Sequence, residues 1–205
     1  MVAAAKAGYQ DVNDFLESRA DNMARTAMAQ LFSYDIVGLR SGKLLEVGAR
    51  TGRYTREIVK YVPGEVQIVT LESIPVSCYG LEKYAARWGN VTVVQGDIFA
   101  NDFDEATFDR VLIPWFDMTM SLYRWGRLLR EAARLLKPGG LVAFDFMDSQ
   151  DRLLEVIAIE SSAPYFLING GDLEAIGRHF GLSKALEFGV TFNEQIAKYH
   201  VYRKG

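Results

Sequence analysis

The chain has 205 residues, of which 49% are hydrophobic and 24% charged, and its formal net charge is −3. This length suffices for one sizeable core, and no apolar run approaches the roughly 20 residues that a membrane span needs. A single cysteine, Cys78, excludes an internal disulfide, and with only 2 histidines we expect no metal site. The acidic balance argues against nucleic acid as a partner, and the N-terminus lacks the apolar core of a secretory signal, so we expect a cytoplasmic protein.

Helical spacing marks the N-terminal segment. Between residues 11 and 32 the apolar side chains recur at helical intervals, at Val12, Phe15, Leu16, Met23, Ala27 and Leu31. Neither a linker nor a repeat divides the chain, so we expect a single domain over residues 1–205. Within it, residues 1–40 are expected to form a helical lid over the functional site.

From residue 41 onward, strand and helix patterns alternate. Strands are predicted at 43–48, 66–72, 90–97, 109–115 and 141–147, and helices at 53–62, 75–89, 121–136 and 170–182. The last helix is expected to take Asp172 as its N-cap and to end before Gly181. Residues 184–192 and 195–204 are predicted to be two strands joined by a turn through Asn193.

This order of elements predicts an α/β protein. Strands that alternate with helices form a mostly parallel sheet with helices on both faces. The closing strand pair has no helix between its members, which implies one antiparallel strand. We therefore expect a three-layer αβα sandwich, with a mostly parallel seven-stranded Rossmann-like core over residues 41–205, an antiparallel strand in its C-terminal hairpin, and the N-terminal helix.

Ligands of such sheets bind beyond the carboxyl ends of the strands. Glu72 ends the second predicted strand about 20 residues after Gly52, where an acid accepts hydrogen bonds from the hydroxyls of a ribose. Asp97 ends the third strand and is placed to accept the amine of an adenine, with Ile98 against the ring. The alternative for Glu72 is an exposed acid at a strand end, without a ligand.

In their order along the chain, these motifs resemble those of the class I S-adenosylmethionine-dependent methyltransferases over roughly residues 40–205. The first motif of that family, E/D-x-G-x-G-x-G, is similar to EVGARTG at 46–52. The acid that ends its second strand matches Glu72, and the GD after its third strand matches Gly96 and Asp97. Its FDxV phrase matches FDRV at 108–111, and the turn into its fifth strand matches LLKPGGLVAFDF at 135–146.

The resemblance implies S-adenosylmethionine as the cofactor, with Glu46 as the anchor of the first loop. The residues implied to bind the cofactor are Glu46, Gly48, Ala49, Arg50, Thr51, Gly52, Glu72, Ser73, Ile74, Asp97, Ile98, Pro114 and Trp115. No catalytic residue is assigned, because methyl transfer from a sulfonium can rely on positioning alone unless the acceptor must lose a proton.

Arg50 departs from the family pattern, since it occupies the middle glycine of the first motif. We expect its backbone to adopt a conformation open to non-glycine residues and its side chain to point away from the cofactor. The alternative is that its guanidinium binds the carboxylate of the cofactor.

Four other features have structural explanations that we favour. Tyr79 and Lys83 form the Y-x-x-x-K of short-chain dehydrogenases but follow the second strand, and IPWF at 113–116 lacks the acceptor of the N-methyltransferase motif it faintly resembles. Basic residues recur on one helix, at Arg124, Arg127, Arg130, Arg134 and Lys137, and are expected to face water. Neither His179 nor His200 comes with a partner that would make it a general base.

The short insertions favour a small-molecule acceptor, methylated on nitrogen or oxygen. Acidic and aromatic residues between 148 and 171 suit an amine acceptor, or else belong to a solvated helix that packs its two aromatics into the core: Asp148, Asp151, Glu155, Glu160, Tyr165 and Phe166. Two alternatives stay open, namely an RNA or protein methyltransferase and a non-catalytic cofactor-binding partner subunit. The oligomeric state does not follow from the sequence.

Overall fold

The computed structural model describes residues 12–114, 120–146, 168–192 and 195–205, and it describes no side chains for residues 12–20, 191–192 and 195–197. Within these ranges the strands form a seven-stranded sheet in the order β3-β2-β1-β4-β5-β7-β6. They are β1 (Gly42–Val47), β2 (Val66–Glu72), β3 (Val91–Gln95), β4 (Phe108–Ile113), β5 (Leu136–Phe146), β6 (Leu182–Phe192) and β7 (Gln195–Lys204). Pairing is parallel from β3 to β5, whereas β7 is antiparallel to both β5 and β6, which confirms the predicted hairpin.

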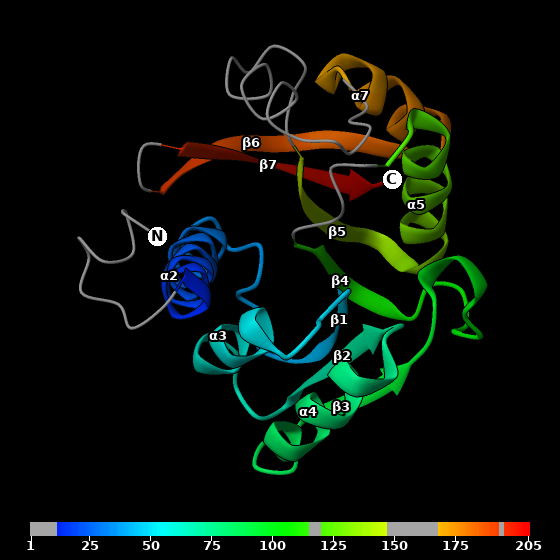
Figure 1. Ribbon diagram of the computed structural model, residues 1–205. Coiled ribbons are helices and arrows are strands. Elements are labelled where there is room, and N and C mark those ends of the chain that lie inside the picture. Colours follow the sequence, from blue (N-terminus) through cyan, green and yellow to red (C-terminus); the bar gives the residue numbers. More distant parts are fainter. Residues whose placement is uncertain (1–11, 115–119, 147–167, 193–194) are drawn as a thin grey trace.

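Helices cover both faces of the sheet, which confirms the three-layer architecture (Figure 1). On one face lie α2 (Val12–Ser33), α3 (Arg53–Tyr61) and α4 (Pro75–Ala85). On the other lie the short 3-10 helix η1 (Ile98–Ala100), α5 (Leu122–Leu135) and α7 (Gly170–His179). Each face has its own apolar core, one beneath α2 and α3 and the other beneath α5 and α7. No helix in the described part of the chain is long and apolar enough to cross a membrane.

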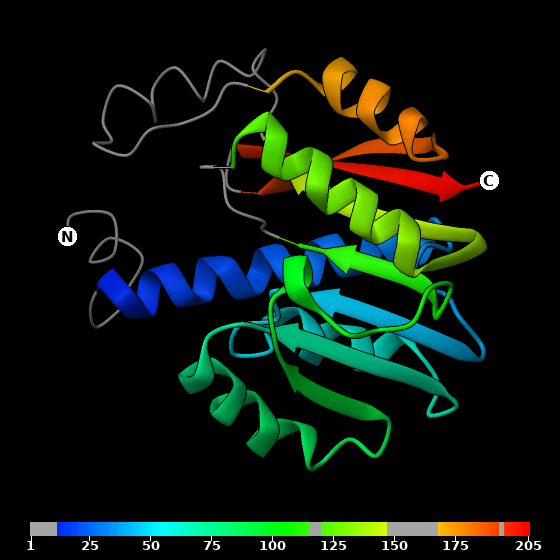
Figure 2. The same ribbon diagram turned by 90° about the vertical axis from the view of Figure 1, so that its right-hand side faces the viewer.

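The N-terminal helix α2 runs alongside the strands (Figure 2). Met23, Ala27 and Leu31 are buried as their spacing predicts, while Val12, Phe15 and Leu16 lie outside the described side chains. The buried half of α2 thus belongs to the packed layer, because it contacts α3 and β6. A lid role for the residues before it remains a proposal.

Capping residues mark the ends of α5 and α7, although the predicted N-cap of α7 is wrong. Ser121 caps α5 by accepting a hydrogen bond from the backbone N–H of Arg124. The N-cap of α7 is Asn169, whose side chain accepts from the N–H of Gly171 at 2.6 Å, so Asp172 lies inside the first turn instead. Gly181, at φ +75°, follows the end of α7 as predicted.

Strand β5 starts at Leu136, earlier than the predicted residue 141. Leu136 already pairs with Phe108 of β4, and the register shifts before the next pair, Arg110 with Leu141, so that K-P-G-G lies in the irregular stretch between the two pairs. The nearby Asp109 carboxylate accepts hydrogen bonds at 2.8 Å from both the Lys43 backbone N–H and the Lys137 ammonium. Burial opposes the charged form of Asp109, but these two hydrogen bonds and the charge of Lys137 outweigh it and lower the pKa of the carboxyl. The motif residues FDRV and KPGG therefore stabilise the amino ends of β1, β4 and β5, opposite the edge where ligands bind.

Replacing Asp109 tests this structural role. Asp109→Asn should lower the free energy of unfolding by about 1 kcal/mol, because a half-exposed ion pair and part of a hydrogen-bond pair are lost. Urea denaturation measures the change, with Asp102→Asn, an exposed acid, as the control. The affinity for S-adenosylhomocysteine should not change. A loss of affinity of tenfold or more would show that the FDRV motif, which contains Asp109, acts on the cofactor site.

Candidate cofactor site

The sheet reverses its strand order between β1 and β4, so that β1 continues to β2 and β3 on one side and β4 continues to β5 on the other. A crevice forms at such a switch point, beyond the carboxyl ends of the parallel strands. Those ends meet at one edge of the sheet (Figure 2). The predicted residues 46–52, 72–74, 97–98 and 114 all follow or end strands at this edge, with Pro114 buried. Trp115 lies outside the described residues.

The loop after β1 alternates left-handed residues. Gly48, Arg50 and Gly52 have φ of 72°, 49° and 80°, respectively, and lie at the three glycine positions of the family motif. The Gly48 N–H donates to the Leu71 carbonyl at 2.8 Å, and the Gly52 N–H to the Ala49 carbonyl at 2.8 Å. A Cβ on Gly52 would lie 2.3 Å from Leu81 Cδ1, so the position requires glycine. The loop thus keeps the left-handed conformation at all three glycine positions of the motif, with the exposed Thr51 between the last two.

Glu72 locks this loop to the end of β2. Its Oε2 accepts a hydrogen bond from the Arg50 backbone N–H at 2.6 Å, and its Oε1 accepts from the Ile74 N–H at 2.8 Å. The side chain is only 3% exposed, whereas Ser73 and Ile74 beside it are exposed. Glu72 is therefore not the exposed acid of the alternative explanation, and its role in holding the loop was not predicted.

The backbone and side chain of Arg50 both agree with what we expected. Its backbone adopts the left-handed conformation, a small region that is open to non-glycine residues at a cost of roughly 1 kcal/mol or more. The hydrogen bond to Glu72 holds it there. Its side chain is exposed, in line with the outward orientation we favoured.

Two substitutions separate the backbone of Arg50 from its side chain. Arg50→Gly should raise the free energy of unfolding by up to about 1 kcal/mol, because glycine tolerates this φ, while Arg50→Ala keeps the unfavourable backbone and should leave stability unchanged. Urea denaturation measures both variants. Equal stability of the two would contradict a backbone cost. If both lost affinity for S-adenosylhomocysteine tenfold or more, the guanidinium would bind the cofactor, as in the alternative explanation.

Glu46 is fully buried at the end of β1, under the loop. Its Oε2 accepts a hydrogen bond from Thr55 Oγ1 at 2.6 Å, and its Oε1 has no hydrogen-bond partner among the described residues. Burial raises its pKa to about 8, against the opposing effect of hydrogen bonds from Thr55, and the charge of Glu72 raises it further. Glu46 therefore links the end of β1 to the first turn of α3 as a largely protonated acid, a state that its position in the motif did not reveal.

Asp97 and Ile98 lie at the end of β3, next to Glu72. The Gly96 N–H donates to the Glu72 carbonyl at 2.9 Å, which brings the ends of β2 and β3 together. Asp97 is exposed and caps η1 by accepting from the Phe99 N–H at 2.9 Å. Ile98 is only 4% exposed and packs in the core with Leu71, so little of its side chain faces a ligand.

A buried hydroxyl pair, which the sequence did not indicate, fixes the first turn of α3. Tyr54 Oη and Tyr199 Oη lie 3.0 Å apart and connect α3 to β7. Burial raises the pKa of both phenols, and the charge of the buried Asp145, the neighbour of Tyr199 on β5, raises each further. Both hydroxyls are therefore neutral at physiological pH, and they hold the helix that follows the loop against the sheet.

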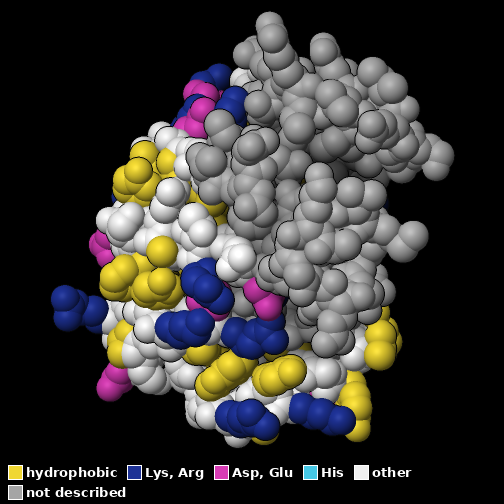
Figure 3. Space-filling view, turned by 60° about the vertical axis from the view of Figure 1, so that its left-hand side comes forward, with side chains coloured by type: hydrophobic (Ala, Val, Ile, Leu, Met, Phe, Trp, Pro, Cys, Tyr) yellow, Lys and Arg dark blue, Asp and Glu magenta, His cyan; other side chains and the backbone are white. Residues whose placement is uncertain are grey.

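Basic side chains gather on the side of the molecule where α2 and α3 lie (Figure 3). Arg53 and Arg56, in the first turns of α3, share the Asp21 carboxylate of α2 at 2.8 Å and 3.3 Å. Arg56 also lies over the ring of Tyr84 on α4. These contacts join three helices next to the loop, and no acidic residue occupies the first turn of α3.

The arginine stripe on α5 is only partly solvated, which corrects the expectation that it faces water. Arg134 pairs with Glu131 and donates to the Phe103 carbonyl, and Lys137 pairs with Asp109. Arg127 lies 4.8 Å from the ring centre of Phe99. Only Arg124 and Arg130 are exposed, so the stripe offers less charge to a nucleic acid than its spacing indicates.

Of the remaining predictions, the one for Tyr79 and Lys83 agrees with the structure and the one for His200 does not. Tyr79 is 61% exposed on α4 with the Lys83 ammonium 4.2 Å from its ring centre, in line with the rejection of a dehydrogenase site. His200 does have a carboxylate neighbour, because Glu187 lies beside it across the β6–β7 pair with an Nδ1–Oε2 distance of 3.6 Å. The acidic and aromatic residues between 148 and 166 lie outside the described residues.

Known proteins resemble the chain in sequence and in fold. A family model described as "Methyltransferase domain" matches residues 44–140. The chain is 25% identical over 143 residues to a demethylmenaquinone methyltransferase of Roseiflexus castenholzii. The aligned region covers 70% of this chain and 57% of that protein. The chain therefore spans little more than half the length of this relative.

Solved structures share the fold at low sequence identity. Magnesium protoporphyrin IX methyltransferase from Synechocystis PCC 6803, with bound SAH, superposes with a TM-score of 0.72 and 11% identity over 92% of this chain and 84% of its own. The [4+2]-cyclase SpnF has a TM-score of 0.69 and 15% identity, over 87% of this chain and 80% of its own. Residues 44–140 thus match a methyltransferase domain, and the chain has the fold of S-adenosylmethionine-dependent methyltransferases.

Proposed function

We propose that the protein binds S-adenosylmethionine at the carboxyl edge of β1–β4 and transfers its methyl group to a nitrogen or oxygen of a small molecule. The observation that carries this proposal is the loop at 48–52, with left-handed residues at all three glycine positions of the motif and its backbone locked on Glu72. The substrates of related methyltransferases support a small acceptor, since the names of two of them refer to a quinone and a porphyrin.

The residues present fit this cofactor. Each oxygen of Glu72 accepts one backbone N–H and keeps a second lone pair, so the carboxylate can also accept two ribose hydroxyls. The buried Glu46 Oε1, without a partner among the described residues, lies under the loop where the methionine part would lie. Asp97, exposed at the end of β3, would accept the adenine amine.

When bound, the cofactor supplies a methyl group on a sulfonium. The chain would then contribute the geometry of the loop, the ribose acceptor Glu72 and the exclusion of water, since positioning two substrates supplies much of the acceleration in such transfers. We assign no general base.

Transfer from S-adenosylmethionine labelled in its methyl group tests the proposal. We expect label in small amines, carboxylates or phenols offered separately, and none with Glu72→Ala. Label in RNA or protein would replace the small acceptor by the alternative substrate class. Cofactor binding without transfer to any of these, or to a cell extract, would favour the non-catalytic partner subunit.

A further inference from the structure

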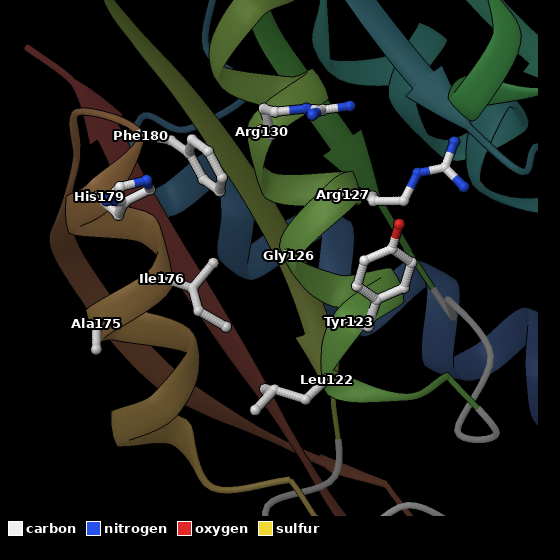
Figure 4. Close-up of a pocket in the computed structure, with 9 residues that line it drawn as sticks. All are labelled: Leu122, Tyr123, Gly126, Arg127, Arg130, Ala175, Ile176, His179 and Phe180. Carbon is white, nitrogen blue, oxygen red and sulfur yellow. The ribbon is translucent and has the colours of Figure 1, made fainter.

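Two open surfaces lie apart from the cofactor site. One is a groove between α5 and α7, where Leu122 and Ile176 are directed into the space between the helices (Figure 4). The guanidinium groups of Arg127 and Arg130 are directed away from this groove, that of Arg127 onto the ring of Phe99, so its walls are almost entirely apolar. Apolar walls alone do not specify an occupant. The other surface is the outer edge of β3, where backbone groups do.

Strand β3 lies at one edge of the sheet, and β2 is its single neighbour among the described strands. On either side of β3, the Asn90 carbonyl accepts a hydrogen bond from β2 at 2.8 Å and the Gly96 N–H donates one to β2 at 2.9 Å. Alternate residues of a strand direct their backbone groups to opposite sides, so the residues between that bond to β2 are Thr92 and Val94. The N–H and C=O groups of Val93 and Gln95 therefore point outward.

These outward groups are available to a partner. Neither Val93 nor Gln95 makes a backbone hydrogen bond on this side within the described part of the chain. The Val91 N–H donates to the Trp88 carbonyl at 3.2 Å, which leaves the Val91 carbonyl as a further outward acceptor. Gln95 is exposed and Val93 is half-buried, so the edge is open to solvent.

The two edges of the sheet differ in how they are protected. Natural proteins block an edge strand with charges, proline or irregular register. The opposite edge, β6, has such protection, because its register with β7 shifts between Lys184 and Leu186 and Lys184 pairs with Glu187. Strand β3 reads V-T-V-V-Q, with no charge, no proline and no shift in its register with β2. This edge is therefore suited to pair with another strand.

We propose that β3 pairs with β3 of a second copy of this chain, antiparallel about a two-fold axis at Val93, so that the two sheets become continuous. The facing pairs are Val93 with Val93, Thr92 with Val94, and Val91 with Gln95. None of these pairs brings like charges together, and the strand is thus complementary to itself. The two Val93 residues exchange both N–H···O=C hydrogen bonds, and each Gln95 N–H donates to a Val91 carbonyl. The contact is independent of the methyl transfer proposed above.

Sedimentation velocity of the full chain tests the proposal. A contact of this size is expected to be weak, so the mass should rise from the 23.0 kDa of one chain toward twice that value between low-micromolar and several-hundred-micromolar protein. Val93→Pro removes the outward N–H, and no bond to β2 uses the backbone of Val93, so this variant should fold and stay monomeric.

Two further variants keep the N–H of residue 93. Val93→Lys places two ammonium groups opposite each other and should weaken the dimer at least tenfold. Val93→Thr, the matched control, keeps a β-branched side chain and should dimerise like the unchanged protein. Urea denaturation establishes that each variant is folded. A monomer at every concentration, or a dimer that both Val93→Pro and Val93→Lys leave intact, would overturn the proposal.

Amide hydrogen exchange locates the contact. Exchange at Val93 and Gln95 should slow as the concentration rises, in proportion to the dimer, whereas Thr92 and Val94, already bonded to β2, should not change. A dimer without this slowing would use another surface, which contradicts the proposal. If the chain stays monomeric and the peptide Thr-Val-Thr-Val-Thr slows exchange at Val93 and Gln95, the edge binds extended segments in general and the second copy is the wrong partner.

Discussion

Glu72→Ala should weaken the binding of S-adenosylhomocysteine about 100-fold. Two ribose hydroxyls would lose a charged acceptor, and at about 1.5 kcal/mol for each such hydrogen bond the loss is about 3 kcal/mol. The substitution also removes the acceptor of the Arg50 and Ile74 N–H groups, so the loop at 48–52 loses its attachment to β2. We expect the free energy of unfolding to fall as well, by about 2 kcal/mol.

Comparing the affinity with the free energy of unfolding shows whether Glu72 acts mainly as the ribose acceptor or mainly holds the loop. Affinity is measured calorimetrically at a temperature where the variant is folded, and stability by urea denaturation. Glu82→Ala on α4, an exposed acid close in sequence, serves as the matched control and should change neither quantity. A Glu72→Ala variant that is less stable but binds S-adenosylhomocysteine with unchanged affinity would show that this 3% exposed carboxylate only holds the loop.

Glu46→Gln should change how stability depends on pH. The folded protein raises the pKa of this carboxyl from 4.5 to about 8, so between these values the native state binds a proton that the unfolded state does not. Stability linked to Glu46 is therefore fully present below pH 4.5 and is lost as the pH rises toward 8. Glutamine is neutral throughout and keeps an oxygen for the Thr55 hydroxyl, so the variant does not lose this contribution.

The difference between the variant and the unchanged protein is the quantity to measure. From pH 5 to pH 8 the free energy of unfolding of Glu46→Gln, relative to the unchanged protein, should increase by about 3 kcal/mol. Urea denaturation at pH 5, 6.5 and 8 gives this difference, and Glu65→Gln, an exposed acid, should show none. Parallel pH dependences for Glu46→Gln and the unchanged protein would mean that Glu46 is already ionised in the folded state.

Local sequence was sufficient for the order of elements and for most boundaries. Ser121 and Gly181 mark the ends of helices because capping depends on a few neighbouring residues. The N-cap of α7 was misassigned because Asn169 and Asp172 are both good caps, and only the path of the chain decides between them. The start of β5 was missed because its first residue, Leu136, pairs with β4 ahead of a register shift, which no local pattern records.

Contacts between distant residues account for what the sequence did not reveal about the site. Glu72 holds the Arg50 backbone across a loop, a helix and a strand, and its burial depends on this packing. Tyr54 and Tyr199 are 145 residues apart in the sequence. The contact between Glu187 and His200, by contrast, could have been predicted from the sequence, because the two predicted strands form a hairpin and their register places these residues side by side.

The most direct test of the central claim is calorimetric titration of the unchanged protein with S-adenosylmethionine and, separately, S-adenosylhomocysteine. We predict that each binds at one site with micromolar affinity, despite the arginine at the middle glycine position. A folded protein that binds neither ligand would show that the loop at 48–52 and Glu72 keep the geometry of the family without its cofactor.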